Sequence, residues 1–442
     1  MADNRKVPKR IAQTILNALK GGVVPRIGLP YITVGRKNEI EAILHDISII
    51  SEGGASFRFI VGKYGSGKSF LLQTIRNYAM DRGFIVSDAD LSPERRLRGT
   101  SGQGLATYRE LISNLSTKTK SEGGALTLIL DKWISSIQSE AANETDLSVN
   151  DALFTKIVDK KINAVTSSIN ELVHGFEFAR LLSLYYHAYL DGDDETKAKV
   201  TKWFKGEYTT KKDAKDELGI NIIITDDDWY DYLKLFALFF RLAGYQGIII
   251  MIDELVNLCK IPSSITRQYN YEKLLAMYND ALQGKARYIG FLMGATPQAM
   301  EDRRRGIYSY EALRSRLQEG KFSKPGARDL LAPVIHLDPL TPEEMLILCE
   351  KLVQIHADLY NYEIKLKAED LAKFITLEYS RIGAEENITP REVIRDFIEL
   401  LDLLYQNPGT SLEKMMESDE FEYSSSILIP DNADSAFEGF SI

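Results

Sequence analysis

The feature that most constrains this chain is an eight-residue stretch, Gly62–Ser69, which reads Gly-Lys-Tyr-Gly-Ser-Gly-Lys-Ser. It follows a short apolar run typical of a buried strand, Phe57–Val61, and it precedes an apolar helical stretch, Phe70–Met80. Glycines let the backbone curl so that successive N–H groups point inward, a geometry that a Cβ atom would obstruct. The alternative is a glycine-rich turn without a ligand. Because both flanks fit, we predict a phosphate-binding P-loop.

The residue types in this loop indicate what it would bind. A lysine in the position of Lys68 reaches the β- and γ-phosphates, and a hydroxyl in the position of Ser69 holds Mg²⁺. The N-terminus of the following helix adds positive potential. We therefore expect ATP and Mg²⁺ as ligands. The predicted nucleotide-binding residues are Gly62, Lys63, Tyr64, Gly65, Ser66, Gly67, Lys68, Ser69 and Phe70.

The composition is that of a globular protein with room for two or three domains, since the chain has 442 residues and 26% of them are charged. No apolar run approaches the ~20 residues that cross a bilayer. The basic N-terminal residues are not followed by an apolar signal core, so we expect no secretion and no membrane contact. Two cysteines, Cys259 and Cys349, predict no disulfide framework. We expect a cytoplasmic protein.

The net charge of −9 is unevenly distributed. Seven acidic residues and no Lys or Arg lie between Met415 and Ile442, and without them the body carries −2. We expect residues 407–442 to form an acidic, mobile tail. It is either an interaction or autoinhibitory arm or a solubilising terminus, and the second reading is favoured.

Strand patterns alternate with helical ones and predict an α/β fold with a parallel sheet. The expected strands are Phe57–Val61, Phe84–Asp90, Ile248–Ile252, Tyr288–Met293 and Pro333–Leu337. Residues 92–245 are mostly helical by pattern, with a long stretch at Phe154–Leu190 and a polar break at Lys211–Asp228. They are too many for one crossover, so we expect a helical insertion. The predicted domains are an N-terminal helix and turn (1–30), the core with its insertion (31–340), an all-α lid (341–406) and the tail.

The run Gly247–Glu254 reads Gly-Ile-Ile-Ile-Met-Ile-Asp-Glu, a buried strand that ends in two carboxylates. Asp253 at the strand tip can hold the Mg²⁺ water shell opposite Ser69. Glu254 is then placed to polarise the attacking water as a general base. Acidic residues at the start of a helix would explain the position but not the pair.

The fourth of the five expected strands, Tyr288–Met293, leads into Gly294-Ala295-Thr296-Pro297. Thr296, at the tip of a strand beside the one that bears Asp253, could orient the water near the γ-phosphate. The alternative is an N-cap, because Thr followed by Pro is good chemistry for a helix start. Both roles can hold at once.

Residues Glu301–Arg328 hold eight basic residues against four acidic ones. Arg314 or Arg316 could act as an arginine finger on a neighbouring subunit's γ-phosphate. The triplet Arg303–Arg305 could instead contact a phosphate backbone. A solvated charged surface is the alternative for both.

A helix start at Thr389-Pro390-Arg391 follows the same logic within the lid. An arginine in its first turns can swing onto the β- and γ-phosphates and couple hydrolysis to lid motion. Arg391 is the first choice and Arg395 the second.

In this order the motifs resemble those of AAA+-type ATPases, in the branch that includes origin-recognition and signalling ATPases. Val34-Gly35-Arg36-Lys37-Asn38-Glu39 is similar to that branch's V-G-R-x-x-E box. The resemblance implies that Val34 and Gly35 pack near the adenine. It also implies a P-loop (AAA+-like) core with a C-terminal lid.

More narrowly, three stretches resemble the BREX-type ATP-binding proteins of bacterial antiphage defence, of the BrxD kind. They are Gly22–Pro25 ahead of the V-G-R box, the glycine-rich loop, and Gly244–Gly247 leading into the Asp253 strand. The likeness covers roughly residues 10–405. It implies an ATPase in a multi-protein defence system, acting on DNA beside a helicase partner. The acidic tail departs from it.

Three functional hypotheses follow. The first is a DNA-associated ATPase that assembles as a homo-oligomer, against which the near-neutral body offers only local basic patches. The second is a nucleotide-dependent switch with slow turnover that recruits partners, although no repeat array or effector domain is evident. The third is an ATP-stabilised scaffold, which an intact Glu254 argues against.

Overall fold

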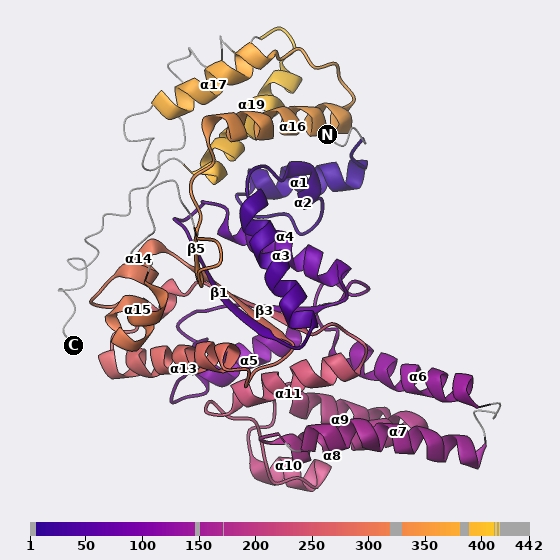
Figure 1. The fold of residues 1–442 in the computed structure, drawn as a ribbon. Coiled ribbons are helices and arrows are strands. Elements are labelled where there is room, and N and C mark those ends of the chain that lie inside the picture. The colour runs from indigo at the N-terminus through magenta and orange to yellow at the C-terminus, as the bar shows by residue number, and fades with distance from the viewer. Residues whose placement is uncertain are drawn as a thin grey trace, which may run out of the picture. The chain divides into compact units, whose positions relative to one another are not determined.

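A computed structural model describes residues 6–145, 151–170, 172–318, 329–380 and 389–410, together with 412 and 415. The chain divides into two compact units. The sheet unit consists of Lys37–Lys63 and Leu71–Leu337. The helical unit consists of Met1–Arg36, Tyr64–Phe70 and Asp338–Ile442. Figure 1 shows the elements of both.

The sheet unit is built on five parallel strands in the order β2-β3-β4-β1-β5 (Figure 1). The strands are β1 (Ala55–Val61), β2 (Ile85–Asp90), β3 (Ile248–Asp253), β4 (Ile289–Ala295) and β5 (Val334–His336). All five lie where the sequence predicts them, and the predicted α/β parallel fold is confirmed. β4 pairs with both β1 and β3, so the strand before Thr296 lies beside the strand that ends in Asp253.

Both faces of the sheet are covered, because successive side chains of a strand point to opposite sides. Phe57, Phe59 and Val61 of β1 face a large core shared with the helices between β2 and β3. Ile60 faces a second core with α3 (Lys37–Ser51) and α4 (Lys68–Asp81). Strands buried on both faces read as continuous apolar runs, which is why they stand out in the sequence.

One charged side chain interrupts β1 on the second face. Arg58 is buried and donates through Nε and Nη2 to the two carboxylate oxygens of Asp46 on α3, at 2.6 and 2.7 Å. Its Nη1 donates to the carbonyl of Ala332, just before β5. A paired and hydrogen-bonded guanidinium is tolerated in a core, and this one ties α3 and the approach to β5 onto β1.

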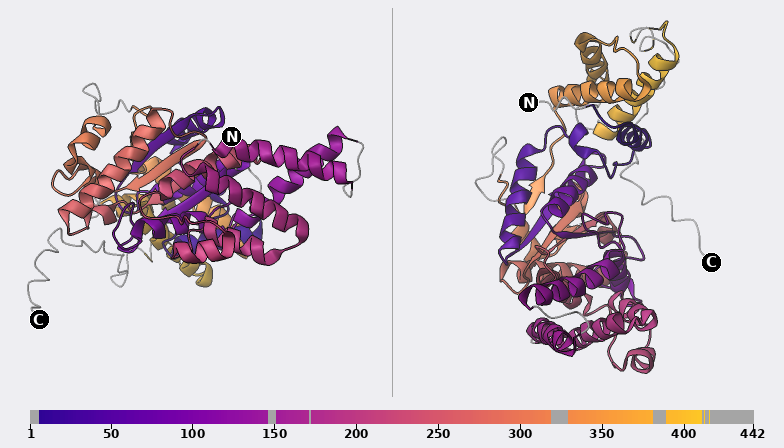
Figure 2. Two further views of the ribbon diagram at one scale, coloured as in Figure 1. Left: turned by 90° about the horizontal axis from the view of Figure 1, so that it is seen from below. Right: turned by 90° about the vertical axis from the view of Figure 1, so that its right-hand side faces the viewer.

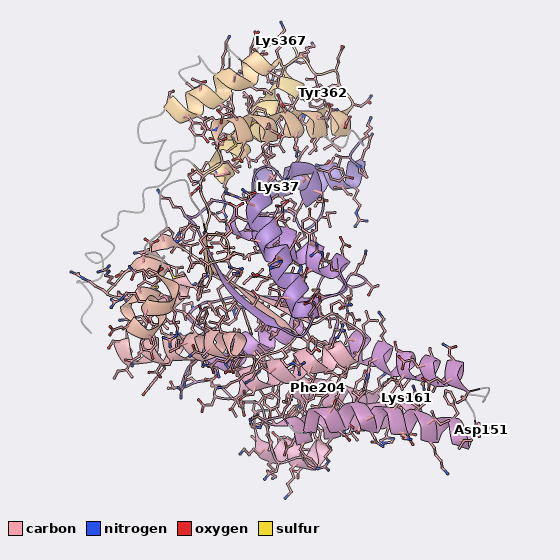
Figure 3. The ribbon with its side chains drawn as sticks, viewed as in Figure 1. Lys37, Asp151, Lys161, Phe204, Tyr362 and Lys367 are labelled. Atoms are coloured by element: carbon pink, nitrogen blue, oxygen red, sulfur yellow. The ribbon has the colours of Figure 1, made fainter. Side chains whose placement is uncertain are left out.

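Seven helices lie between β2 and β3 in the part of this segment that the structure describes. They are α5 (Gln103–Ser113), α6 (Leu126–Glu144), α7 (Ala152–Asn170), α8 (Gly175–Asp191), α9 (Asp194–Phe204), α10 (Lys211–Leu218) and α11 (Trp229–Leu242). Figure 1 and the left view of Figure 2 show α6 and α7 side by side, leading away from the sheet. Lys161 of α7 joins them through ion pairs with Glu140 and Glu144 of α6, at 3.7 and 2.8 Å (Figure 3).

Two expectations for this region are wrong. The predicted break at Lys211–Asp228 contains α10, because Thr210 accepts a hydrogen bond from the Asp213 N–H and Ala214 and Leu218 are buried. The long stretch Phe154–Leu190 is two helices, because His174 adopts a left-handed backbone conformation before α8. The Thr210 cap allows a helix in a charge-rich segment, and the left-handed backbone at His174 sets a helix boundary that the apolar periodicity does not show.

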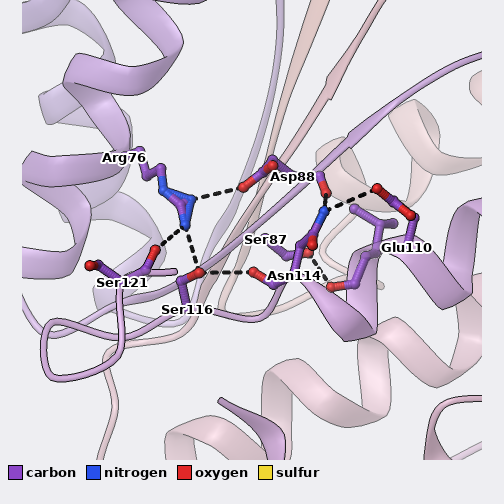
Figure 4. Close-up of polar contacts among 8 residues, drawn as sticks. Arg76, Ser87, Asp88, Glu110, Asn114, Ser116 and Ser121 are labelled. Carbon is purple, nitrogen blue, oxygen red and sulfur yellow. Dashed lines mark hydrogen bonds and ion pairs between the residues drawn. The ribbon is translucent and has the colours of Figure 1, made fainter. Parts of the chain in front are cut away.

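A buried polar network fastens the beginning of this helical region to β2 (Figure 4). Arg76 of α4 pairs with Asp88 of β2 at 2.8 Å and donates to the Ser116 hydroxyl and the Ser121 carbonyl at 2.6 and 2.7 Å. Asn114 donates to the Asp88 carbonyl at 2.9 Å. These bonds fix the loop after α5 against the sheet.

The remaining helices of the sheet unit follow β3 and β4. They are α12 (Val256–Cys259), α13 (Ser264–Leu282), α14 (Pro297–Glu301), the 3₁₀ turn η1 (Ile307–Ser309) and α15 (Glu311–Leu317). Cys259 and Cys349 are both buried free thiols. No helix within the described residues is long and apolar enough to cross a membrane.

The helical unit has its own apolar core. Its helices are α1 (Lys9–Lys20), the short α2 (Leu29–Ile32), α16 (Pro342–Tyr360), α17 (Ala368–Ser380) and α19 (Pro390–Gln406). α1 buries Ala12, Ile15 and Leu16 in the same cluster as Leu352 of α16 and Phe397 of α19. The acidic tail after Met415 lies outside the described residues, as do the basic residues predicted between 319 and 328.

Candidate functional site

The glycine-rich loop leaves the carboxyl end of β1 and runs into the N-terminus of α4. Its first residue is anchored on the sheet, since the Gly62 N–H donates to the Ala295 carbonyl at the end of β4, at 3.1 Å. Gly65 and Gly67 have φ values of +74° and +95°, which L side chains rarely adopt. The sequence pattern therefore corresponds to the curled backbone that it predicts.

Within the loop, some side chains are buried and others face solvent. Ser66 and Lys68 are buried, at 7% and 8% exposure, whereas Lys63, Tyr64 and Ser69 are exposed. The Lys68 ammonium lies 5.4 Å from the centre of the Tyr64 ring, a cation–π arrangement. The Tyr64 ring thus lies beside the lysine that is predicted to bind the phosphates.

Two groups of the helical unit hold the loop in shape. Arg36, with φ of +61°, donates through Nη2 to the carbonyls of Ser66 and Asp338, at 3.0 and 2.7 Å. Thr389, the N-cap residue of α19, lies so close to Gly65 that a Cβ there would come within 2.7 Å of its Oγ1. Only glycine fits this contact. The loop is therefore linked to the residue before the lid helices and to the start of α19.

The other predicted residues of the helical unit are placed as follows. Val34 and Phe70 are partly buried against the helical core. Gly35 packs against Glu344, whose side chain completes the capping box of α16. Both therefore contribute to packing in this structure, and a contact with adenine stays a prediction.

The two candidate lid arginines differ in their surroundings. Arg391 is exposed and its aliphatic stem lies near Gly22. Arg395 forms an ion pair with the neighbouring Asp396 at 3.5 Å and is 43% exposed. Arg391 is thus the one without a carboxylate partner among the described residues, which agrees with its ranking as first choice for a phosphate contact.

The acidic residues gather at the carboxyl edge of the sheet. Asp253 ends β3, and its Oδ1 accepts the Glu254 N–H at 2.8 Å. Its side chain leans over Gly294 of β4, where a Cβ would collide with Oδ1. Glu254 has φ of +60°, a strained conformation for a side chain of its size. Such strain is often retained at functional positions, so it makes Glu254 a stronger candidate.

Asp90, the last residue of β2, is the register partner of Asp253. Although Asp90 is exposed to solvent on one side, partial desolvation and then the charges of Asp253 and Glu254 raise its pKa above the usual range. Asp90, Asp253 and Glu254 thus bring negative charge together at this edge of the sheet. Asp90 was not among the predicted site residues. The sequence signal is the acidic end of the strand Phe84–Asp90, whereas its pairing with Asp253 is visible only in the structure.

Thr296 follows β4 and is buried. Its hydroxyl accepts the Ala299 N–H at 3.1 Å, as an N-cap of α14 does. The capping alternative is therefore present. Orientation of a water molecule by the same hydroxyl stays a prediction.

The arginines proposed as fingers lie on α15, a helix of the sheet unit. Arg316 is exposed and donates to the Ala312 carbonyl of its own helix at 2.7 Å. Arg314 forms a weak contact with Glu311 at 3.8 Å. In these contacts both side chains bond only within α15, and their reach to a neighbouring subunit stays a prediction.

The residues present fit the predicted ligands. The buried Ser66 Oγ has no hydrogen-bond partner, and the space that a Cβ of Gly67 would enter is open within 4 Å. Phosphate oxygens are suitable partners for both features. No group of three or more His, Cys, Asp and Glu side chains within the described residues is arranged to hold a metal ion. Magnesium in nucleotide sites relies on one or two protein oxygens plus phosphates and water, which is compatible with Ser69 and Asp253.

Arg36 is the second residue that sequence reasoning missed. The resemblance drew attention to Val34 and Gly35, whereas the side chain that touches the loop is the next one. An arginine beside a glycine at the end of an extended segment is a weak signal, and only the structure brings it to Ser66.

Comparison with known proteins adds one match. A family model described as BREX system ATP-binding protein BrxC/D matches residues 7–420, nearly the whole of the 442-residue chain. This match confirms the resemblance carried by the motifs. No curated protein matches the chain.

Proposed function

The chain belongs to the family of BREX system ATP-binding proteins BrxC/D, and on that premise we propose that it hydrolyses ATP as a DNA-associated ATPase of an antiphage defence system. The observation that carries the proposal is the glycine-rich loop between β1 and α4, with two left-handed glycines and a buried lysine. A loop of this form supplies backbone N–H groups and a cation where phosphate oxygens bind.

We assign the binding of phosphate and of magnesium to different residues. Lys68 binds the β- and γ-phosphates, and Ser69 and Asp253 hold the magnesium ion, directly or through water. Magnesium, when bound, neutralises charge that develops on the phosphate oxygens. The Lys68 ammonium lies 5.4 Å from the Tyr64 ring centre, so the ring contributes to the surroundings of this charge.

Glu254 is the general base in this proposal. It follows Asp253 directly, with a strained backbone, at the end of β3, and Thr296 follows the end of the neighbouring strand β4. A positioned base contributes typically 10²–10⁴-fold to a rate. Thr296 orients the attacking water, and the Arg391 guanidinium of α19 contacts the γ-phosphate.

The larger parts of the chain have proposed roles as well. Residues 92–245 act as a helical insertion and residues 341–406 as a lid that responds to nucleotide. The active form is a homo-oligomer in the cytoplasm with ATP at subunit contacts, working on double-stranded DNA beside other defence proteins such as a helicase.

The test is steady-state ATP hydrolysis, with and without double-stranded DNA, over a range of protein concentrations. Lys68→Ala should lose nucleotide binding, whereas Glu254→Gln should bind nucleotide and lose turnover by about 10²-fold or more. Glu41→Gln on α3, 63% exposed, is the matched control. Normal hydrolysis by Glu254→Gln would remove that residue from the catalytic role. Slow turnover indifferent to DNA and to protein concentration would favour the alternative, a nucleotide-dependent switch that recruits protein partners.

A further inference from the structure

Three chain segments leave the carboxyl edge of the sheet and are joined by hydrogen bonds. They are residues 91–102 after β2, 254–263 after β3 and 296–306 after β4. The side chain of Asn257 donates to the Leu91 carbonyl at 2.8 Å, and the thiol of Cys259 to the Ala299 carbonyl at 3.4 Å. The loops that begin at Asp90, Glu254 and Thr296 thus form one connected surface of the sheet unit.

Cationic side chains gather on this surface. Arg303, Arg304 and Arg305 are exposed, and the Asp302 carboxylate is occupied by the backbone N–H groups of the last two. The Arg305 side chain reaches the Lys260 and Ile261 carbonyls, at 3.5 and 3.4 Å. Arg267 of α13 donates to the same Ile261 carbonyl at 2.7 Å. The triplet is therefore continuous with the first turn of α13.

A pocket of about 650 Å³ opens next to this first turn. Thr266 and Tyr269 of α13 line it, with Arg98 from the loop after β2 and Arg109 and Leu105 from α5. Tyr269 is 44% exposed, and the Arg98 guanidinium lies 4.9 Å from its ring centre. A flat ring with a flat guanidinium on it is a surface on which a nucleobase stacks.

The acidic residues of the pocket already have partners. Asp226 accepts the N–H groups of Gly102 and Leu105 at the start of α5. Asp227 pairs with Arg98 at 3.2 Å. The Nε of Arg109, another residue that lines the pocket, donates to the Gly206 carbonyl at 2.8 Å. Two arginines and two aspartates line the pocket, so its formal charge is balanced, and the positive charge of this surface comes from Arg303–Arg305.

We propose that this surface binds single-stranded DNA, with an unpaired base against Arg98 and Tyr269 and the phosphates along Arg303–Arg305. The proposal rests on the DNA association proposed above and differs from it in one respect, because it assigns this surface to an unpaired strand and not to the duplex. A pocket of this size, with an aromatic ring and several hydroxyl and charged groups on its wall, has room for a group as small as a base and hydrogen-bonding partners for its edge. A fully paired duplex presents no free base face to it.

The placement also explains how DNA would affect hydrolysis. The loop from Glu254 reaches Lys260 after six positions, and the loop from Thr296 reaches Arg303 after seven. A DNA strand that binds these loops and orders them restricts the motion of Glu254 and Thr296, the residues at which the loops begin. Single-stranded DNA is then an activator as well as a ligand.

Fluorescence anisotropy of the full chain tests the binding, with a labelled oligothymidylate and a duplex of the same length. The oligothymidylate should bind more tightly. Tyr269→Ala should weaken its binding about tenfold, and Tyr269→Phe should retain it because the ring remains. Alanine at Arg303–Arg305 should flatten the salt dependence. Tyr78→Ala, at a tyrosine of α4 that is 39% exposed, is the matched control.

Equal binding of duplex and single strand would overturn the proposal, and so would wild-type affinity in Tyr269→Ala. Competition by free dTMP as strong as that of the oligonucleotide would indicate a mononucleotide site instead. Thermal unfolding of each variant excludes a folding defect. ATP turnover without DNA is measured separately, so failure here is distinguishable from failure of the ATPase assignment.

Discussion

At the residue scale, the phosphate loop depends on side chains outside the eight-residue motif. Arg36 donates to Ser66 in the loop and to Asp338, the first residue of the helical unit's C-terminal segment. Two carbonyls that converge on one guanidinium nitrogen leave little freedom for the loop backbone. Arg36 is thus a positioning residue for Lys68, and it connects the loop to the chain that leads to α16.

Replacing Arg36 tests this role. Arg36→Ala should weaken nucleotide binding about tenfold, because a loop that is no longer held must be ordered by the ligand itself. Arg36→Lys should restore only part of the affinity, since an ammonium lacks the planar fork. Titration with a fluorescent nucleotide measures both, and Lys37→Ala, at a neighbour that is 83% exposed, is the control. Unchanged nucleotide affinity in Arg36→Ala would show that the eight-residue loop keeps its binding conformation without Arg36.

Also at this scale, sequence identified what the chemistry needs but not what supports it. Lys68, Ser69, Asp253 and Glu254 follow from spacing and strand patterns. Lys68 and Ser69 begin α4, Asp253 ends β3 and Glu254 follows it, and their roles in chemistry stay predictions. The role of Asp90 depends on which strand pairs with β3, a pairing between residues far apart in the chain. Local patterns contain no information about such a partner.

At the scale of elements, the regular strands were predictable because burial on both faces leaves continuous apolar runs. The exceptions are helices set by caps. α10 has a low apolar content and is stabilised by the Thr210 hydroxyl, and the turn at His174 divides α7 from α8. Single residues decide these boundaries, so periodicity over a window of ten or more positions does not resolve them.

A buried histidine joins three helices of the helical unit and makes its stability depend on pH. His356 of α16 is fully buried, with Nδ1 2.9 Å from the Tyr362 hydroxyl and Nε2 3.0 Å from Asp402 of α19. Asp402 also accepts from Lys20 of α1 at 2.5 Å. Burial lowers the pKa of His356, and this outweighs the opposing effect of Asp402. Although burial opposes it, the hydrogen bonds from Lys20 and His356 lower the pKa of Asp402, which stays charged near neutral pH.

The sign of the pH effect follows. Below the ordinary histidine pKa of about 6.5, the unfolded chain binds a proton that the folded protein resists, so the free energy of unfolding falls as pH drops. We expect stability to decline between about pH 7 and 5 and His356→Gln to show a flatter decline. Urea unfolding at several pH values measures both, with His45→Gln on α3 as the control histidine. An unchanged pH slope in His356→Gln would assign the decline to other groups.

At the scale of the whole molecule, distant segments of sequence build one core. α1 lies more than three hundred positions before α16 and α19, yet its apolar stripe is buried against them. The amphipathic pattern predicted the helix but could not indicate its partner. Residues Tyr64–Phe70 of the glycine-rich loop region belong to this same unit, so a nucleotide on them bears directly on the contacts of Arg36 and Thr389.

The assembly proposed for this chain makes a prediction that a monomer cannot satisfy. If Arg316 acts on the nucleotide of a neighbouring subunit, Arg316→Ala should lose turnover by roughly 10³-fold while it still binds ATP. Mixing it with Glu254→Gln should restore part of the activity, because the second variant keeps its arginine and the first keeps its base. Arg314→Ala in the same series identifies which arginine is the finger. Since Arg316 otherwise contacts only its own helix in the bonds described above, its loss should leave the thermal unfolding midpoint unchanged. Absence of rescue at every mixing ratio would mean that each subunit completes its own site, and the oligomer would then have no part in the chemistry.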